Sequence, residues 1–220
     1  EGANRRISIC ADSQNWSILV DSYQGKSLNR PNDVVCHSNG TIYFTDPAGR
    51  LPDQERVLPF SGVFMIDSSN KPSVATKECE YPNGLAFSPD EKLLYVSISR
   101  LNENCIEEKK QGLVCHHQFI RVFDVNSDGT LSNNRIFADM SSSSDGVPDG
   151  MKVDQAGQLF CTGPGGCWVF TPNGTHIGTI KLPEVPANLA FGGPDWKNIY
   201  FTARTSIYLM QTYEPGIPVW

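Results

Sequence analysis

The stretch 146–163 reads Gly-Val-Pro-Asp-Gly-Met-Lys-Val-Asp-Gln-Ala-Gly-Gln-Leu-Phe-Cys-Thr-Gly. Asp149 stands between a proline and a glycine, directly before a short run in which apolar and polar residues alternate. The turn Gln155-Ala156-Gly157 separates this run from a second apolar run at 159–161. Two such runs around a turn are typical of a β-hairpin. The stretch therefore predicts one hairpin with a carboxylate at its entrance.

Three further copies of this phrase occur, beginning at Pro31, Pro82 and Pro186. Each places a short polar side chain before its first apolar run, so that Asn32, Asn83 and Asn188 hold the place of Asp149. After each of the first three copies, two more apolar runs surround a turn and predict a second hairpin. Two hairpins in succession predict a four-stranded antiparallel sheet.

The spacing of these polar residues indicates how the sheets are arranged. They are 51 (32 to 83), 66 (83 to 149) and 39 (149 to 188) positions apart. Blades of a β-propeller repeat at roughly 40–50 residues. The longest interval contains the polar segment 100–117, which has no counterpart in the other units and is interpreted as an insertion at a blade edge. We predict an all-β propeller of four-stranded blades, forming a single domain over residues 1–220, with the four polar residues facing its central channel.

Composition excludes several classes of function. The formal net charge is −6 and the sequence shows no basic stripe, which argues against a nucleic-acid partner. No apolar window approaches the length of a membrane span. Nineteen glycines and fifteen prolines suit a chain rich in turns. The compartment (cytoplasmic, periplasmic or secreted) and the oligomeric state stay open.

None of the seven cysteines has the spacing of a metal site. Cys105 and Cys115 flank a polar excursion, and Cys161 and Cys167 flank a tight turn, so either pair could form a disulfide. The alternative, which we favour, is that all are free thiols buried as small apolar side chains.

Three asparagine amides and one carboxylate offer hard oxygen donors, which suit Ca²⁺ or Mg²⁺. One carboxylate supplies little charge for a tight divalent site, so a second acid is expected. The alternative is that an Asn or Asp close behind a proline is simply favourable turn chemistry. Because the four residues recur in register, we favour the functional interpretation.

Several motifs together resemble one known family. They are Asn29-Arg30-Pro31-Asn32-Asp33, Phe44-Thr45-Asp46-Pro47, Tyr81-Pro82-Asn83-Gly84-Leu85, Pro148-Asp149-Gly150-Met151 and Ala190-Phe191-Gly192-Gly193-Pro194-Asp195. In this order they resemble the gluconolactonase/regucalcin (senescence-marker) family. The resemblance implies a six-bladed β-propeller and a metal-dependent lactone hydrolase. At roughly 45 residues per blade, 220 residues suffice for about five blades, so the first blade is expected to be missing.

The resemblance also assigns site residues. It implies that Asn83, Asp149 and Asn32 hold one divalent cation, most simply Ca²⁺, with Mg²⁺, Mn²⁺ or Zn²⁺ as alternatives. It makes Asp149 the general base and Arg30 a substrate-orienting group, and Asn32 also contacts substrate. Asp46 and Asn188 are further candidates for the substrate pocket. The expected reaction is the opening of a small sugar lactone whose carbonyl the cation polarises.

The sequence departs from the family's pattern in two places. The family carries a metal-binding Glu in a Glu-Gly-Pro-Val-Trp-like phrase near its N-terminus, whereas this sequence opens Glu1-Gly2-Ala3-Asn4. The strand after the second repeat reads Ser97-Ile98-Ser99, where the family often has an acid. The second departure is expected to alter the pocket wall. Because the metal-binding Glu is absent, the alternative is a non-catalytic propeller, a scaffold that binds or handles Ca²⁺.

Overall fold

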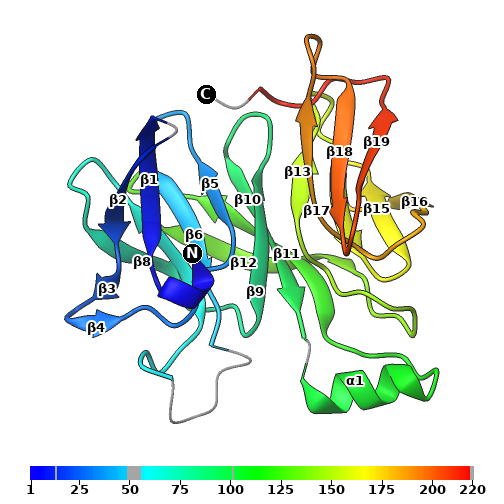
Figure 1. The fold of residues 1–220 in the computed structure, drawn as a ribbon, viewed down its shortest axis with the longest axis horizontal. Coiled ribbons are helices and arrows are strands. Elements are labelled where there is room, and N and C mark those ends of the chain that lie inside the picture. The colour runs from blue at the N-terminus through cyan, green and yellow to red at the C-terminus, as the bar shows by residue number, and fades with distance from the viewer. Residues whose placement is uncertain (13, 49–55, 101, 219–220) are drawn as a thin grey trace.

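The structure, a computed structural model, describes residues 1–12, 14–48, 56–100 and 102–218, and nearly all of its regular structure is β-sheet (Figure 1). After the 3-10 turn η1 (Gly2–Asn4), two small sheets pair β1 (Ile7–Asp12) with β2 (Asn15–Val20) and β3 (Ser22–Tyr23) with β4 (Lys26–Ser27). Four larger sheets follow in chain order, and their strands are antiparallel neighbours. They are arranged as four blades of a β-propeller.

The first three blades have four strands each and the fourth has three. The first blade contains β5 (Val34–Cys36), β6 (Ile42–Asp46), β7 (Gly62–Ile66) and β8 (Pro72–Thr76). The second contains β9 (Pro82–Phe87), β10 (Leu93–Ser99), β11 (Gln118–Val125) and β12 (Leu131–Asp139). The third contains β13 (Met151–Val153), β14 (Leu159–Gly163), β15 (Gly166–Phe170) and β16 (His176–Ile180). The fourth contains β17 (Pro186–Gly192), β18 (Asn198–Ala203) and β19 (Ile207–Gln211).

The predicted hairpins are confirmed, since every repeated phrase forms the first two strands of a blade. The number of blades is lower than the length led us to expect. The described residues form four blades, and the β1–β2 hairpin stays a two-stranded sheet. One reason is that the connection between β10 and β11 lengthens the second blade well beyond an ordinary repeat.

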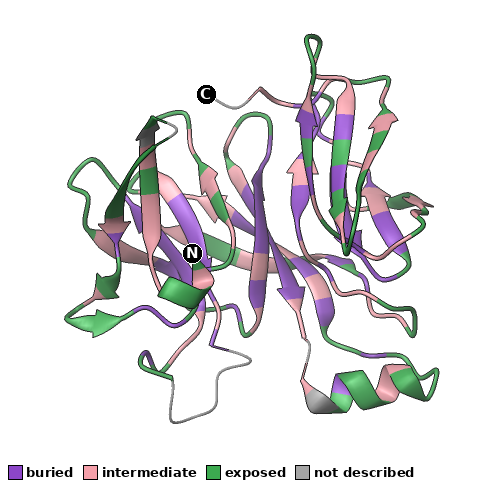
Figure 2. Cartoon of the chain, viewed as in Figure 1, coloured by how far each residue is buried: buried purple, intermediate pink, exposed green. Residues whose placement is uncertain are grey.

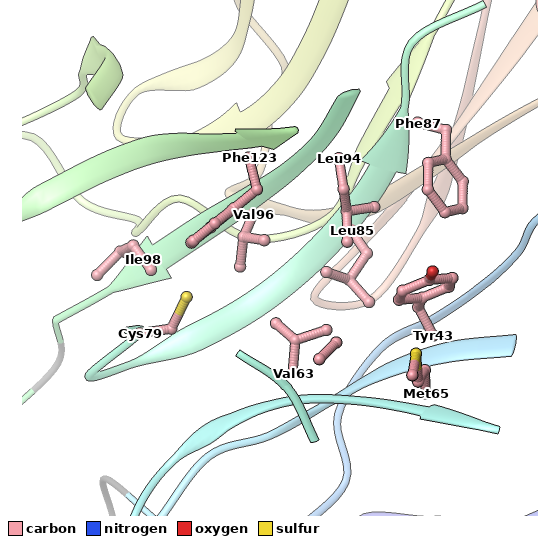
Figure 3. Packing of buried hydrophobic residues seen from close by; sticks show 11 residues of the cluster. Tyr43, Val63, Met65, Cys79, Leu85, Phe87, Leu94, Val96, Ile98 and Phe123 are labelled. Atoms are coloured by element: carbon pink, nitrogen blue, oxygen red, sulfur yellow. The ribbon is translucent and has the colours of Figure 1, made fainter. Parts of the chain in front are cut away.

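Buried residues concentrate on the strands of the blades, as Figure 2 shows, and most of their clusters join residues of neighbouring blades. Tyr43, Val63 and Met65 of the first blade pack with side chains of the second blade, among them Leu85 and Phe123 (Figure 3). The Tyr43 hydroxyl donates to the carbonyl of Gly129 at 2.7 Å, so its polar end is also satisfied. Burying one such side chain stabilises the fold by about 2 kcal/mol. The blades are therefore joined chiefly by apolar contact, which fixes the channel at their inner edges.

The insertion between β10 and β11 contains the α-helix α1 (Glu103–Lys110), which the sequence analysis did not predict. Asn102 caps the helix, because its side chain accepts a hydrogen bond from the backbone of Cys105 at 2.9 Å. Cys105 and Cys115 form a disulfide with their Cα atoms 5.1 Å apart. The favoured free-thiol interpretation is therefore wrong for this pair.

The same interpretation holds for Cys161 and Cys167, which are buried and free. Burial raises the pKa of both thiols, so they stay protonated. Within the described residues, no helix is long and apolar enough to cross a membrane.

Candidate metal and substrate site

The inner strands of neighbouring blades are joined by a repeated hydroxyl contact. Thr45, Ser97 and Thr162 occupy equivalent places in the second strand of successive blades. Their hydroxyl groups donate to the backbone carbonyls of Asn83 (2.8 Å), Asp149 (2.8 Å) and Ala187 (2.9 Å), each in the next blade. These bonds hold the peptides that carry Asn83 and Asp149 side by side with their neighbours.

Two glycines let these peptides approach closely. A Cβ atom at Gly84 would overlap the carbonyl oxygen of Asp149, and one at Gly150 would overlap the side chain of Asn188. The Gly that follows Asn83 and Asp149 in the repeated phrase is thus required by packing against the next blade. The inner edge is built at backbone level, which fixes the spacing of the polar side chains.

Asn83 is half-buried and its amide is oriented by Ser99. Its Nδ2 donates to the Ser99 hydroxyl at 2.9 Å, and that hydroxyl donates in turn to the carbonyl of Pro148. Its Oδ1 is buried and accepts no hydrogen bond from the described residues. A buried carbonyl oxygen without a donor is unfavourable by about 1–3 kcal/mol. The geometry therefore leaves one hard oxygen donor for a ligand.

Asp149 lies on the peptide next to this amide. Its backbone N–H donates to Thr162 at 2.9 Å and its carbonyl receives the Ser97 hydroxyl, so both backbone groups are fixed. Its side chain is half-buried and lines a cavity of about 490 Å³. The structure thus brings the backbone segments of Asn83 and Asp149 together, and Asp149 also lines the cavity.

Asn32 and Arg30 occupy the corresponding entrance of the first blade, and both side chains are exposed. The backbone N–H of Asn32 donates to the Thr45 carbonyl at 3.0 Å, and the Thr45 hydroxyl reaches Asn83. Asn32 is therefore connected to Asn83 through a single residue. The roles of Asn32 and Arg30 toward a metal or substrate stay predictions.

Asp46 is fully buried, and its two oxygens accept the backbone N–H groups of Asn29 (2.8 Å) and Arg30 (2.7 Å). Burial raises the pKa of this carboxyl to about 6, against the lowering effect of these two hydrogen bonds. The contacts make Asp46 the residue that shapes the 29–30 segment. They give no support to the expected direct contact with substrate.

Asn188 lies one position later in the phrase than Asn32, Asn83 and Asp149. The residue that receives the hydroxyl of Thr162 is Ala187, so Ala187 is the counterpart of Asn83 and Asp149. The Oδ1 atom of Asn188 accepts the N–H of Leu189 at 2.8 Å, as Oδ1 of Asp33 accepts that of Val34 at 2.9 Å. Asn188 is therefore the counterpart of Asp33, and its contact with substrate stays a prediction.

Lys152, on β13, is a half-buried cation near Asp33 that the sequence analysis did not consider. Burial lowers the pKa of its ammonium group, and the nearby Asp33 carboxylate opposes that shift. Its Nζ donates to the carbonyl of Met151 at 2.9 Å, while Asp33 accepts the N–H of Leu85 at 3.1 Å. Lys152 lies three residues after Asp149 on a strand of alternating polarity. The one sequence signal that could have identified it is a charged residue between the buried Met151 and Val153.

The residues present fit a divalent cation. Asn83 offers a buried amide oxygen without a donor, and the neighbouring Asp149 offers a carboxylate. Oxygen donors of this kind suit Ca²⁺ or Mg²⁺ better than zinc. Cys105, Glu108 and Cys115 also cluster, but the two sulfur atoms are bonded to each other and offer no thiolate.

Comparisons with known proteins agree with this description. Residues 2–205 match the SMP-30/gluconolactonase/LRE-like region. The chain is 31% identical over 207 residues to the gluconolactonase of Zymomonas mobilis, covering 89% of this chain and 54% of that protein. The chain thus spans about half the length of that relative.

Two solved structures are similar in fold. One is a gluconolactonase from Xanthomonas campestris, with a TM-score of 0.77 and 29% identity, covering 97% of this chain and 66% of that one. The other is the calcium-binding protein regucalcin from Agrobacterium tumefaciens, with a TM-score of 0.60 and 18% identity, covering 79% and 52%. At that identity, the second shows the fold alone. The chain belongs to the SMP-30/gluconolactonase/LRE-like family.

Proposed function

We propose that this protein is a hydrolase that opens a small sugar lactone with the help of one divalent cation, most simply Ca²⁺. The observation that carries the proposal is the pair formed by Asn83 and Asp149. One presents a buried oxygen without a donor, and the other lies on the adjoining peptide at a cavity. Family membership supplies the type of reaction, because the relatives described above include gluconolactonases.

In this proposal Asn83, Asp149 and Asn32 hold the cation. When bound, the cation supplies a Lewis acid for the carbonyl oxygen of the lactone. The Ser99 hydroxyl keeps the Asn83 amide turned so that Oδ1 and not Nδ2 is offered to the ligand. The hydroxyl contacts across the blades hold these donors in place before substrate arrives, which reduces the reorganisation needed for reaction.

Asp149 also acts as the general base. Its carboxylate orients a water molecule and takes its proton as that water attacks the lactone carbonyl. Arg30, placed by the contact between its backbone N–H and Asp46, orients the hydroxyl groups of the substrate. The family resemblance also implies six blades, and the proposal includes this number for the whole protein. A structure of the full gene product would show how many blades it has.

The test compares Ca²⁺-dependent hydrolysis of glucono-1,5-lactone by the wild-type protein and by Asp149→Ala. Loss of both the base and a ligand is expected to lower kcat/KM by about 10³-fold or more. Asp195→Ala, an exposed acid in the β17–β18 turn, is the matched control and keeps full activity. Equal rates for Asp149→Ala and wild type would refute the role given to Asp149. A protein that binds Ca²⁺ in calorimetry and hydrolyses no lactone would be a binding scaffold instead.

A further inference from the structure

The cavity beside Asp149 has a second wall that the repeated blades do not supply. The helix α1 contributes Ile106, Lys109 and Lys110, and the turn after β18 contributes Arg204. Figure 1 shows α1 beyond the lower edge of the sheets, on the side toward which the β18–β19 turn points. The repeated phrases contribute Asp149, Pro186 and Ala187 to the cavity, and the unrepeated residues supply much of the rest of its lining.

The charge of the cavity differs in sign from that of the chain. Three cationic side chains line it, Lys109, Lys110 and Arg204, against two acidic ones, Asp145 and Asp149. The chain as a whole carries a formal charge of −6. A cation held by Asp149 would make the cavity more positive still. A substrate with a negatively charged group is therefore attracted to this cavity, although the rest of the surface repels it.

Lys109 attaches the wall to the neighbouring segment, so its ammonium group is not fully available to a ligand. Its Nζ donates to the carbonyls of Gly146 (2.6 Å) and Ser144 (2.8 Å), in the segment that leads to Asp149. The disulfide between Cys105 and Cys115 closes the other side of the excursion, and the backbone N–H of Cys115 donates to Ser142 at 3.1 Å. The helix is thus tied to the Asp149 segment at two places.

Lys110, at the end of this fixed helix, and Arg204, in the turn after β18, are exposed cations. The ammonium of Lys110 lies 3.8 Å from Glu107, an exposed pair that contributes little and can exchange partner. The remaining lining of the cavity is mainly apolar and includes Ile106, Val147 and Val185. Asp149 and the two exposed cations thus line one cavity, which allows a single ligand to contact both.

We propose that Lys110 and Arg204 form an anion-binding subsite, so that the preferred substrate is a sugar lactone with a phosphate, sulfonate or carboxylate at the end remote from the ester. The inference rests on the proposed function, because it assigns the substrate class of that same site. It adds two specificity residues that take no part in the chemistry.

The kinetic test compares 6-phosphoglucono-1,5-lactone with glucono-1,5-lactone on wild type and on the double variant Lys110→Gln/Arg204→Gln. Wild type is expected to favour the phosphorylated lactone by about tenfold or more in kcat/KM, since two charge-assisted hydrogen bonds are gained. The double variant is expected to lose that preference and to keep its rate on the neutral lactone within about twofold. The exposed, remote variant Lys92→Gln serves as the matched control. Equal rates on both lactones in wild type, or equal losses on both in the double variant, would overturn the subsite.

A binding test separates this proposal from the proposed function. Gluconate 6-phosphate and gluconate contain no lactone, so calorimetry reports binding without any reaction. Tighter binding of the phosphorylated acid, abolished by the double variant and weakened by added salt, supports the subsite even if neither lactone is hydrolysed. Hydrolysis of lactones with identical affinity for the two acids would retain the function and refute the subsite.

Discussion

The inner edge of the blades and the wall of the cavity meet at Asp149 and are held by different kinds of contact. The inner edge, which we call the floor, comprises residues 30–33, 83–84 and 149–150 and is set by backbone groups and buried hydroxyls that repeat from blade to blade. The wall, residues 102–118, is set by one disulfide, one lysine and one capped helix that occur once. The difference teaches that the floor cannot change without disturbing the propeller. The wall can be replaced, so it is where specificity is expected to vary.

The largest effect is expected from adding one methyl group to the floor, which tests whether the floor tolerates any change. Gly84→Ala would place a Cβ atom against the carbonyl oxygen of Asp149, so neighbouring blades must separate. We expect a loss of more than about 3 kcal/mol in the free energy of unfolding, measured by urea denaturation. Gly178→Ala is the control, because nothing lies within 4 Å of its Cβ position. Equal free energies of unfolding for the two variants would show that the floor accommodates the added methyl group without separation of the blades.

The titration of Asp46 gives a pH-dependent test of the floor. Its carboxyl has a pKa of about 6 in the folded protein against an ordinary value of 3.8, so the folded state binds the proton more tightly. The contribution of Asp46 to stability is therefore fully present below about pH 4 and falls as pH rises to about 6, by up to about 3 kcal/mol. The stability difference between wild type and Asp46→Asn should follow this fall in urea denaturation at several pH values.

The control for Asp46 is Asp128, whose pKa is lowered by hydrogen bonds from Thr130. Stability that depends on Asp128 is present above its ordinary pKa and is lost as pH falls, the opposite direction. A difference curve for Asp46 that rises with pH would mean that the two backbone N–H bonds outweigh burial.

The smallest expected effect comes from opening the wall. The double variant Cys105→Ser/Cys115→Ser removes a short cross-link and is expected to lower stability by about 2 kcal/mol. Hydrogen exchange should quicken in α1 and leave the inner strands β9 and β13 unchanged, because the wall is attached only at its edges. Cys36→Ser, at an exposed free cysteine, is the control. Faster exchange in the inner strands as well would show that floor and wall form one cooperative unit.

The sequence predicted most of the floor because repetition makes it visible. The copies at Pro31, Pro82 and Pro148 located the hairpins and placed Asn83 and Asp149 at neighbouring inner edges. The fourth copy misled by one residue, since the Asn in it follows Ala187 and corresponds to Asp33. The offset is visible in the sequence, because Asn188 is the second residue after its proline, whereas Asn32, Asn83 and Asp149 directly follow theirs.

The wall was largely hidden from the sequence. The polar segment 100–117 has no second copy, so no pattern could place it against the cavity. The Asn102 cap and the cysteine pair were signals for a stapled helix, yet two cysteines alone do not reveal their pairing. Asp46 was identified as a candidate, but only the fold shows that both of its oxygens are used by backbone N–H groups.

The hydroxyl contacts between blades all run in one direction along the chain. Thr45, Ser97 and Thr162 reach acceptors 38, 52 and 25 residues later. During synthesis each hydroxyl therefore stays hydrogen-bonded to water until the following blade has been synthesised. The smallest piece of nascent chain with a satisfied inner edge is two adjacent blades, so this protein is suited to maturing by successive pairs from its N-terminal side.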